Sequence, residues 1–148
     1  MISAIDLVKR FEGCRLHPYY DVAGVPTVGY GTIYGSSGER IRITDAPITQ
    51  AEADTLLNRD VAHSAASVAR LCSGAKLSEG QAAALTDFTY NLGAGTFQHS
   101  TARQFILSGD LALVPEQMLR YVRAGGRVVP GLVKRREAEV EVWNERAV

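Results

Sequence analysis

Residues 12–32 read EGCRLHPYYDVAGVPTVGYGT, a stretch in which a short amphipathic helix of residues 3–12 is predicted to end and a glycine-rich hairpin to begin. Gly13 is the stop signal for the helix. The residues that follow are largely aromatic or β-branched, with glycines at turn positions, and residues 40–44 alternate with period two. We therefore expect residues 14–45 to form a small β-lobe, an antiparallel sheet of two or three strands.

The rest of the chain has the pattern of helices. Capping boxes begin at Thr49 and at Ser78, and each predicts a helix N-terminus. We expect helices at about 50–71, 78–92, 101–107, 114–124 and 130–143. The predicted fold class is α+β and mainly helical. Residues 1–148 would form a single domain with a β-lobe, a connecting helix at about 50–71 and a helical lobe. The helical lobe would consist of residues of about 78–148 and the N-terminal helix. Two such lobes usually leave a cleft between them, where ligands bind.

Three polar residues in the opening stretch form a candidate acid–base site. Glu12 falls at the C-terminal end of a helix, where the macrodipole disfavours a carboxylate by roughly a few tenths of a kcal/mol. Asp21 and Thr27 follow within the predicted hairpin. Inverting glycoside hydrolysis uses one carboxylic acid to protonate the leaving oxygen and a second group to activate a water on the opposite face. A helix end followed by a hairpin can bring these groups to one concave site.

Spacing alone leaves a structural role open for each of the three. Glu12 could be a solvated residue paired with Arg10 or Arg15. Asp21 could cap a turn, because aspartate side chains accept hydrogen bonds from backbone amides two residues on. Thr27 could be an ordinary strand residue.

The order of these residues resembles the catalytic signature of phage-type lysozymes, glycoside hydrolase family 24. Eight residues separate Glu12 from Asp21, five separate Asp21 from Thr27, and VGYGT follows at 28–32. Two further stretches look like the family's central helix and its C-terminal helices: QAAALTDFTYNLGAG at 81–95, and the region of Gly125-Gly126, GLVKRRE at 131–137 and Trp143. Three motifs in the correct order make the resemblance specific.

The resemblance implies a lysozyme-like two-lobed fold with an active-site cleft between the lobes. It also implies a muramidase of the endolysin type, which hydrolyses the β-1,4 bond between N-acetylmuramic acid and N-acetylglucosamine in bacterial peptidoglycan for host-cell lysis. By analogy, Glu12 is the general acid, and Asp21 with Thr27 positions the attacking water. No cofactor or metal is implied. Two alternatives stay open: a lytic transglycosylase, and a non-catalytic peptidoglycan-binding domain.

Substrate contacts and supporting residues also follow from the resemblance. Tyr30, Gly31 and Ile33 look like the cleft-lining hairpin, although Tyr30 and Ile33 could instead pack within the sheet. Gln104, in a short helix expected to face the β-lobe, matches a position that contacts substrate. These four are the candidate substrate-binding residues.

Two residues are candidates for structural support of the site. Arg135 aligns with a family arginine near the catalytic helix, which suggests an ion pair with Asp6, Glu12 or the adjacent backbone. Asn91 is polar within an apolar helix, so it is expected either in the core or at the floor of the cleft.

Composition limits the partners. The chain has 148 residues, 46% of them hydrophobic, with Lys+Arg 16 against Asp+Glu 16. Zero net charge excludes a protein that binds nucleic acid over its whole surface. Residues 116–136 nevertheless hold six basic residues and one acidic residue, and residues 44–60 hold four acidic and one basic. The basic segment predicts either a face that meets the anionic cell wall or ordinary solvated helix faces.

The cysteines, histidines and hydropathy give negative expectations. Cys14 and Cys72 are expected to be reduced thiols, and Cys14 a bystander rather than a nucleophile paired with His17, which we place in a loop. The histidines lack metal-ligand spacing. There is no signal-peptide pattern and no membrane-spanning run. We expect a monomer without membrane insertion, which stays in the host cytoplasm until a holin lesion or a virion delivers it to the wall.

Overall fold

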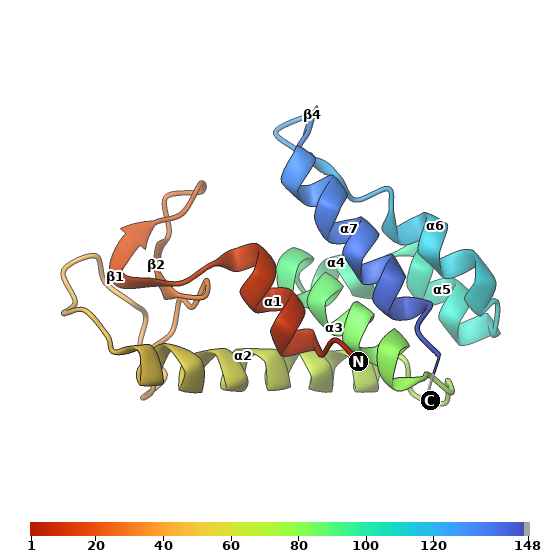
Figure 1. The fold of residues 1–148 in the computed structure, drawn as a ribbon, viewed down its shortest axis with the longest axis horizontal. Helices are drawn as coiled ribbons and strands as arrows, with labels where there is room; N and C mark the ends of the chain where they lie inside the picture. The colour runs from red at the N-terminus through yellow and green to blue at the C-terminus, as the bar shows by residue number, and fades with distance from the viewer. Residues whose placement is uncertain (147–148) are drawn as a thin grey trace.

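The long helix α2 (Gln50–Leu71) joins two lobes of the molecule (Figure 1). The computed structural model describes residues 1–146. A small β-lobe lies at the N-terminal end of α2 and a larger group of helices lies toward its C-terminal end. This arrangement confirms the predicted fold class. Within the described residues, no helix is both long and apolar enough to cross a membrane.

The β-lobe has a sheet of two antiparallel strands, β1 (Arg15–Tyr20) and β2 (Pro26–Gly29). The prediction that residues 40–44 form a strand is wrong. Only one isolated bridge, between Tyr34 and Arg40, reaches this segment, and the Asp45 carboxylate turns the chain by accepting the Arg42 amide at 2.8 Å. The loop prediction for His17 is also wrong, because His17 lies within β1.

The helical lobe contains most of the predicted helices. One predicted helix ends earlier than expected, and one short helix was not predicted. Its helices and one small hairpin are α1 (Ala4–Glu12), α3 (Glu79–Leu92), α4 (Ala94–Gln98), α5 (Thr101–Ser108), the 3₁₀ turn η1 (Leu111–Leu113), α6 (Val114–Met118), β3 (Arg123–Ala124), β4 (Arg127–Val128) and α7 (Pro130–Trp143). The short helix α4 follows α3 directly at Gly93 and was not predicted.

Side-chain capping explains where the helices begin. Ser78 and Gln81 form a complete capping box at the start of α3, as the sequence predicts. At α2 only half of the box forms. The Thr49 hydroxyl accepts a hydrogen bond from the Glu52 amide at 3.1 Å. The Glu52 carboxylate, however, accepts from the Thr49 hydroxyl and not from the Thr49 amide. An ordinary N-cap is enough to start a helix of this length.

The predicted helix at 114–124 ends early, at Met118. Gly125 and Gly126, which follow the predicted helix in the chain, form the two-residue loop of the β3–β4 hairpin, with φ of 58° and 77°. Two successive positive φ angles are what a tight hairpin turn with the right twist requires, and glycine adopts them without a Cβ clash. The hairpin projects from the start of α7 on the far side of the molecule from α2 (Figure 1).

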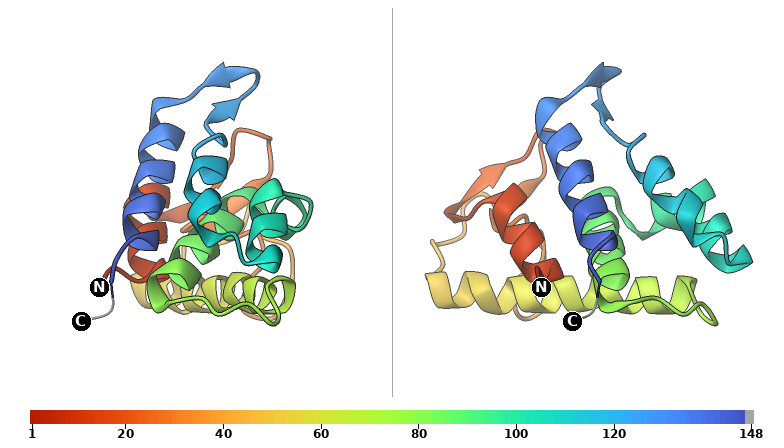
Figure 2. Two further views of the ribbon diagram at one scale, coloured as in Figure 1. Left: turned by 90° about the vertical axis from the view of Figure 1, so that its right-hand side faces the viewer. Right: turned by 45° about the vertical axis from the view of Figure 1, so that its right-hand side comes forward.

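Two apolar clusters form the core, one within the helical lobe and one that reaches the β-lobe. Helix α3 packs against α2, α1 and α7 (Figure 2), and its fully buried Phe88 meets Phe97 edge-on. The second cluster contains Val8 of α1, Tyr30 of the hairpin and Leu57 of α2. Because this cluster joins three elements, it fixes the C-terminal end of α1 against the β-lobe.

Polar contacts from α2 hold the loop that follows the hairpin. The Arg59 guanidinium donates to the carbonyls of Tyr34 and Gly35 at 2.7 and 2.6 Å. The neighbouring Asp60 carboxylate accepts the Thr32 hydroxyl at 2.7 Å. The glycine-rich segment is therefore bound to a helix rather than to a third strand.

Replacement of Arg59 by methionine tests this attachment. The variant keeps a long apolar stem but loses both charged hydrogen bonds to the loop, so we expect the free energy of unfolding to fall by about 1–2 kcal/mol. Urea denaturation followed by circular dichroism measures it. Arg70→Met, at an exposed position on the same helix, is the matched control and is expected to change the stability by about 0.5 kcal/mol or less. Equal midpoints for the two variants would show that the loop does not depend on Arg59.

Candidate active site

Glu12 is the last residue of α1 and points at a buried arginine of α7. Its Oε1 accepts a hydrogen bond from Nη1 of Arg135 at 2.7 Å. The Glu12 side chain is 26% exposed, and the Arg135 side chain is 4% exposed. Glu12 is thus one of the three partners expected for Arg135. Asp6, another of them, is instead bound to Ser3 in the α1 capping box.

Asp87 of α3 holds Arg135 from the other side. Its two carboxylate oxygens accept from Nε and Nη2 of Arg135 at 2.9 and 2.8 Å, a bidentate pair with Asp87 fully buried. Burial alone would lower the pKa of Arg135, but the contacts with Asp87 and Glu12 outweigh it and raise that pKa. Arg135 is therefore a fixed positive charge, shared between two carboxylates.

The glycine-rich hairpin lies directly against Glu12. A Cβ at Gly31 would sit 3.6 Å from Glu12 Oε2, and Gly31 has a φ of +92°, which disfavours any other residue. The Tyr90 hydroxyl of α3 donates to the Tyr30 carbonyl at 2.6 Å and fixes this backbone. Gly31 is thus the hairpin residue that shapes the surroundings of the Glu12 carboxylate.

The side chain of Tyr30 has a packing role. It is 8% exposed, belongs to the apolar cluster with Val8, and its hydroxyl accepts from Gln50 at 3.1 Å. Tyr30 lies just beyond β2, so its side chain packs against α1 and α2 rather than within the sheet. Ile33 is half-buried, and its carbonyl accepts the Ile41 amide at 2.8 Å.

Asp21 and Thr27 lie on the same hairpin as Gly31. Asp21 Oδ1 accepts the amides of Ala23 and Val25 at 2.8 and 2.9 Å, so the turn-capping role is present. Within residues 1–146, Asp21 Oδ2 receives no hydrogen bond and is available to a water. The Thr27 hydroxyl donates to the Val25 carbonyl at 2.8 Å and is left with lone pairs to accept from a water. A capping role and a catalytic role are compatible here.

Tyr19 links the two carboxylates electrostatically. Its pKa is raised, first by burial and then by the negative charges of Glu12 and Asp21, while Arg15, stacked 4.4 Å from the ring centre, opposes this. Glu12 and Asp21 thus both contribute to the electrostatic surroundings of the Tyr19 phenol. Sequence reasoning missed Tyr19. Its pairing with Thr27 across the sheet could have indicated it.

Within residues 1–146, no hydrogen bond joins the other candidates to Glu12 or Asp21. Gln104 is exposed on α5, and no hydrogen bond of its side chain is formed within residues 1–146. Asn91 accepts from the buried Arg136 at 2.7 Å, so it belongs to the interior of the helical lobe. Cys14 is a free thiol with a weak contact to Gln50 at 3.8 Å.

The basic segment does not form one continuous face. Arg135 and Arg136 are buried, with 4% and 0% exposure, and Arg120 lies 3.7 Å from Glu116. Arg123 and Arg127 remain exposed, on the β3–β4 hairpin. Two of the six basic residues therefore serve the interior rather than a wall-binding surface.

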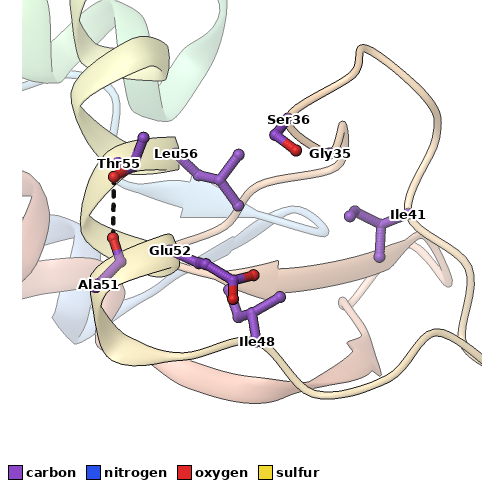
Figure 3. A pocket seen from close by; sticks show the side chains of 8 residues that line it. All are labelled: Gly35, Ser36, Ile41, Ile48, Ala51, Glu52, Thr55 and Leu56. Atoms are coloured by element: carbon purple, nitrogen blue, oxygen red, sulfur yellow. Dashed lines mark hydrogen bonds between the residues drawn. The ribbon is translucent and has the colours of Figure 1, made fainter.

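A pocket of about 390 Å³ lies elsewhere, between α2 and the loop after the hairpin (Figure 3). Its lining is mostly apolar, with Glu52 as its one acidic side chain. Its residues are Gly35, Ser36, Ile41, Ile48, Ala51, Glu52, Thr55 and Leu56. Glu12, Asp21 and Thr27 are not among them. Within residues 1–146, no group of His, Cys, Asp and Glu is arranged to hold a metal ion.

Comparisons with known proteins agree on one family. Residues 9–139 match the family model described as "Phage lysozyme". The chain is 38% identical over 137 residues to the SAR-endolysin of Bacteriophage PS119 (91% of this chain, 78% of that protein). It is 36% identical over 138 residues to the endolysin of Bacillus phage B103 (93% of this chain), and spans only 51% of that protein. The solved endolysin of Escherichia coli O157:H7 phage FAHEc1 superposes with a TM-score of 0.84 at 30% identity, covering 98% of this chain and 94% of that one.

Proposed function

Because the chain belongs to the phage lysozyme family, we propose that it is an endolysin-type muramidase that cleaves the β-1,4 bond between N-acetylmuramic acid and N-acetylglucosamine in bacterial peptidoglycan. The observation that carries this proposal is the placement of Glu12, about a quarter exposed, between a buried arginine and a glycine hairpin that bears a second carboxylate. The relatives named as endolysins support it.

In the proposed reaction Glu12 is the general acid. Its proton passes to the glycosidic oxygen as the bond to the anomeric carbon breaks, and an oxocarbenium-like transition state forms. Arg135 orients the carboxyl through the 2.7 Å contact. Because Asp87 shares the charge of Arg135, Glu12 does not face an isolated guanidinium, which would oppose its protonation.

Asp21 and Thr27 handle the water. The two amide hydrogen bonds to Oδ1 fix the Asp21 carboxylate and leave Oδ2 to take a proton from a water. Thr27 accepts from the same water and holds it on the face of the sugar opposite Glu12. Attack from that face inverts the anomeric configuration.

Digestion of purified peptidoglycan tests the function directly. An inverting muramidase releases products with a reducing end and the α-configuration, resolved by mass spectrometry and by proton NMR of the first products. A lytic transglycosylase would give an anhydro-sugar without uptake of water. A binding domain would give no product. Either of the last two results rejects the proposal.

Replacement of Thr27 by valine tests the water-holding role. The variant keeps the β-branched shape of a residue that is 3% exposed, so we expect it to fold. Loss of the hydroxyl is expected to lower kcat about 10- to 100-fold with little change in KM, because the lost contact is to the water rather than to the sugar. Thr27→Ser, which keeps the hydroxyl, is the matched control. If valine and serine behave alike, Thr27 has only a structural role.

The place of action follows from the proposed substrate. We infer that the protein acts at the cell wall after release from the cytoplasm of the infected cell, as a monomer. Fractionation of expressing cells with and without a coexpressed holin tests the release. Equal wall degradation in both cultures would contradict it.

A further inference from the structure

The two carboxylate oxygens of Glu12 have different neighbours. Oε1 accepts from Arg135 at 2.7 Å, whereas Oε2 receives no hydrogen bond within residues 1–146. A Cβ at Gly31 would sit 3.6 Å from Oε2 and 3.9 Å from the carboxyl carbon of Glu12. In the proposed reaction Oε2 is therefore the oxygen left to carry the proton, and the Gly31 backbone is the wall beside it.

The Gly31 backbone belongs to a tight turn of residues 28–32. The amides of Val28 and Thr32 each donate to the carbonyl of the other residue at 2.9 Å, which closes the turn. Gly31 itself has a φ of +92°, a conformation that is open to glycine and costly for other residues. The turn is thus a closed unit, and its distance from Glu12 depends on the contacts that hold it from outside.

Two helices hold this turn, one on each side of Gly31. On the α2 side, the Thr32 hydroxyl donates to the Asp60 carboxylate at 2.7 Å. On the α3 side, the Tyr90 hydroxyl donates to the Tyr30 carbonyl at 2.6 Å. A Cβ at Gly31 would also sit 3.8 Å from the Tyr90 hydroxyl oxygen. Because α3 belongs to the helical lobe, the Tyr90 contact fixes the turn of the β-lobe against that lobe.

The surroundings of Tyr90 suit a fixed donor. Its ring is partly buried against the apolar cluster that contains Val8 and Leu57, so packing sets the direction of the hydroxyl. Burial first, and then the negative charges of Asp60 and Glu12, raises the pKa of Tyr90. The phenol therefore keeps its proton and remains able to donate to the turn.

We propose that Tyr90 is a positioning residue: its hydroxyl holds the 28–32 turn so that the Gly31 backbone stays against Glu12 Oε2 and keeps this oxygen oriented for proton transfer. The inference rests on the proposed function, because it gives Tyr90 a part in the same reaction. Tyr90 acts through the turn and not on the sugar. Since a displacement of about 1 Å at a reacting group can cost about 10²-fold in rate, release of the turn is expected to lower kcat rather than to raise KM.

Replacement of Tyr90 by phenylalanine tests the hydroxyl. The ring keeps its packing, and the Tyr30 carbonyl loses its donor. With soluble peptidoglycan strands as substrate, kcat is expected to fall about tenfold while KM stays within about twofold of the wild type. A wild-type kcat in folded Tyr90→Phe overturns the proposal.

Tyr121→Phe is the matched control. Tyr121 also packs in the helical lobe, with its ring 5.0 Å from that of Phe88, and its hydroxyl forms no hydrogen bond within residues 1–146. Its kcat and KM are expected to equal those of the wild type. A loss of kcat as large as in Tyr90→Phe would show a general effect of removing a phenol hydroxyl and would reject the specific role of Tyr90.

A double-mutant cycle shows whether Tyr90 acts through Glu12. In the Glu12→Gln background the acid is already gone, so Tyr90→Phe is expected to change the residual rate by about twofold or less. A further loss of about tenfold in that background would mean that Tyr90 acts independently of Glu12 and would overturn the proposal.

Thr32→Val releases the same turn from its α2 side. It removes the hydroxyl bound to Asp60, keeps the β-branched shape and leaves Tyr90 unchanged, so it tests the turn even if Tyr90→Phe does not fold. A lower kcat at constant KM is again expected. A wild-type kcat would show that the position of the turn does not govern Glu12, and the proposal would fail.

Amide hydrogen exchange tests the hold on the turn without any activity. The Thr32 amide, bonded to the Val28 carbonyl, is expected to exchange about tenfold faster in Tyr90→Phe than in the wild type, and at the wild-type rate in Tyr121→Phe. Equal rates in all three proteins overturn the proposal. If exchange is faster in Tyr90→Phe but the wild type releases no product from peptidoglycan, the proposed function fails and the hold of Tyr90 on the turn stands.

Discussion

Replacing Glu12 by glutamine is expected to lower the rate of peptidoglycan hydrolysis about 10²- to 10⁴-fold, the usual contribution of a general acid. The glutamine amide retains an oxygen that can accept a hydrogen bond from Arg135 Nη1 in place of the 2.7 Å contact. We therefore expect the variant to fold. It has no ionisable proton to give to the leaving oxygen. The measurement is the initial rate of release of reducing ends from purified peptidoglycan, with circular dichroism and thermal unfolding as checks on the fold.

Glu137→Gln is the matched control. Glu137 is an exposed glutamate on α7, and its replacement by glutamine removes the same charge as Glu12→Gln. Its rate is expected to equal that of the wild type. A Glu12→Gln variant with normal structure and a normal rate would remove Glu12 from the reaction and leave its contact with Arg135 as a structural ion pair.

The second large effect concerns the pH dependence of stability. Glu139 has its pKa raised from 4.5 to about 10 by burial and by Asp87, so the folded protein keeps a proton that the unfolded chain releases above about pH 4.5. Where the folded state binds more protons, stability falls as the pH rises. The contribution of Glu139 to the free energy of unfolding is complete below about pH 4.5 and is lost progressively up to about pH 10. Between pH 5 and pH 8 the loss amounts to as much as about 4 kcal/mol.

Glu139→Gln removes this proton equilibrium and keeps the side-chain shape. We expect the free energy of unfolding of the variant to decline less than that of the wild type between pH 5 and pH 8, so the variant gains relative stability as the pH rises. Urea denaturation at both pH values measures the difference, and Glu137→Gln corrects for loss of one ordinary glutamate. Parallel curves for wild type and Glu139→Gln would mean that Glu139 is ionised in the folded state.

Local signals predicted the parts of the fold that local physics controls. Ser3 and Ser78 start helices by capping, Gly13 and Gly93 end them, and each of these acts through neighbours three or four residues away. Glu12 lies at the end of α1, and Asp21 and Thr27 lie on the hairpin that follows it in the chain. Their joint role in catalysis stays a prediction.

Non-local contacts account for what the sequence did not predict. The pairing of Asp87 with Arg135 joins positions 48 apart, and nothing in either local pattern indicates the other. Asp87 was not among the candidate residues predicted from the sequence. Arg136 was counted with a solvated basic segment, although it is fully buried, because sequence charge does not show which face of a helix points inward.

The strand error has a similar cause. Period-two alternation at 40–44 is the pattern of a strand, but a strand also needs a partner along its length. Arg59 and Asp60 of α2 supply the polar contacts to the preceding segment, and only the Arg40 bridge to Tyr34 forms. Two consecutive glycines are equally typical of a helix stop and of a hairpin turn. Only the pairing of β3 with β4 on either side of Gly125 and Gly126 shows that they form a turn.

The ion pair between Glu12 and Arg135 joins residues 123 positions apart, one in the first helix and one in the last. A growing polypeptide on the ribosome therefore cannot form it until α7 has emerged. If the proposed role of Glu12 is right, every incomplete translation product that stops before α7 has its acid without its partner. Lytic competence would then appear only once nearly the whole domain has been synthesised, and prematurely terminated chains would pose little danger to the cell that makes them.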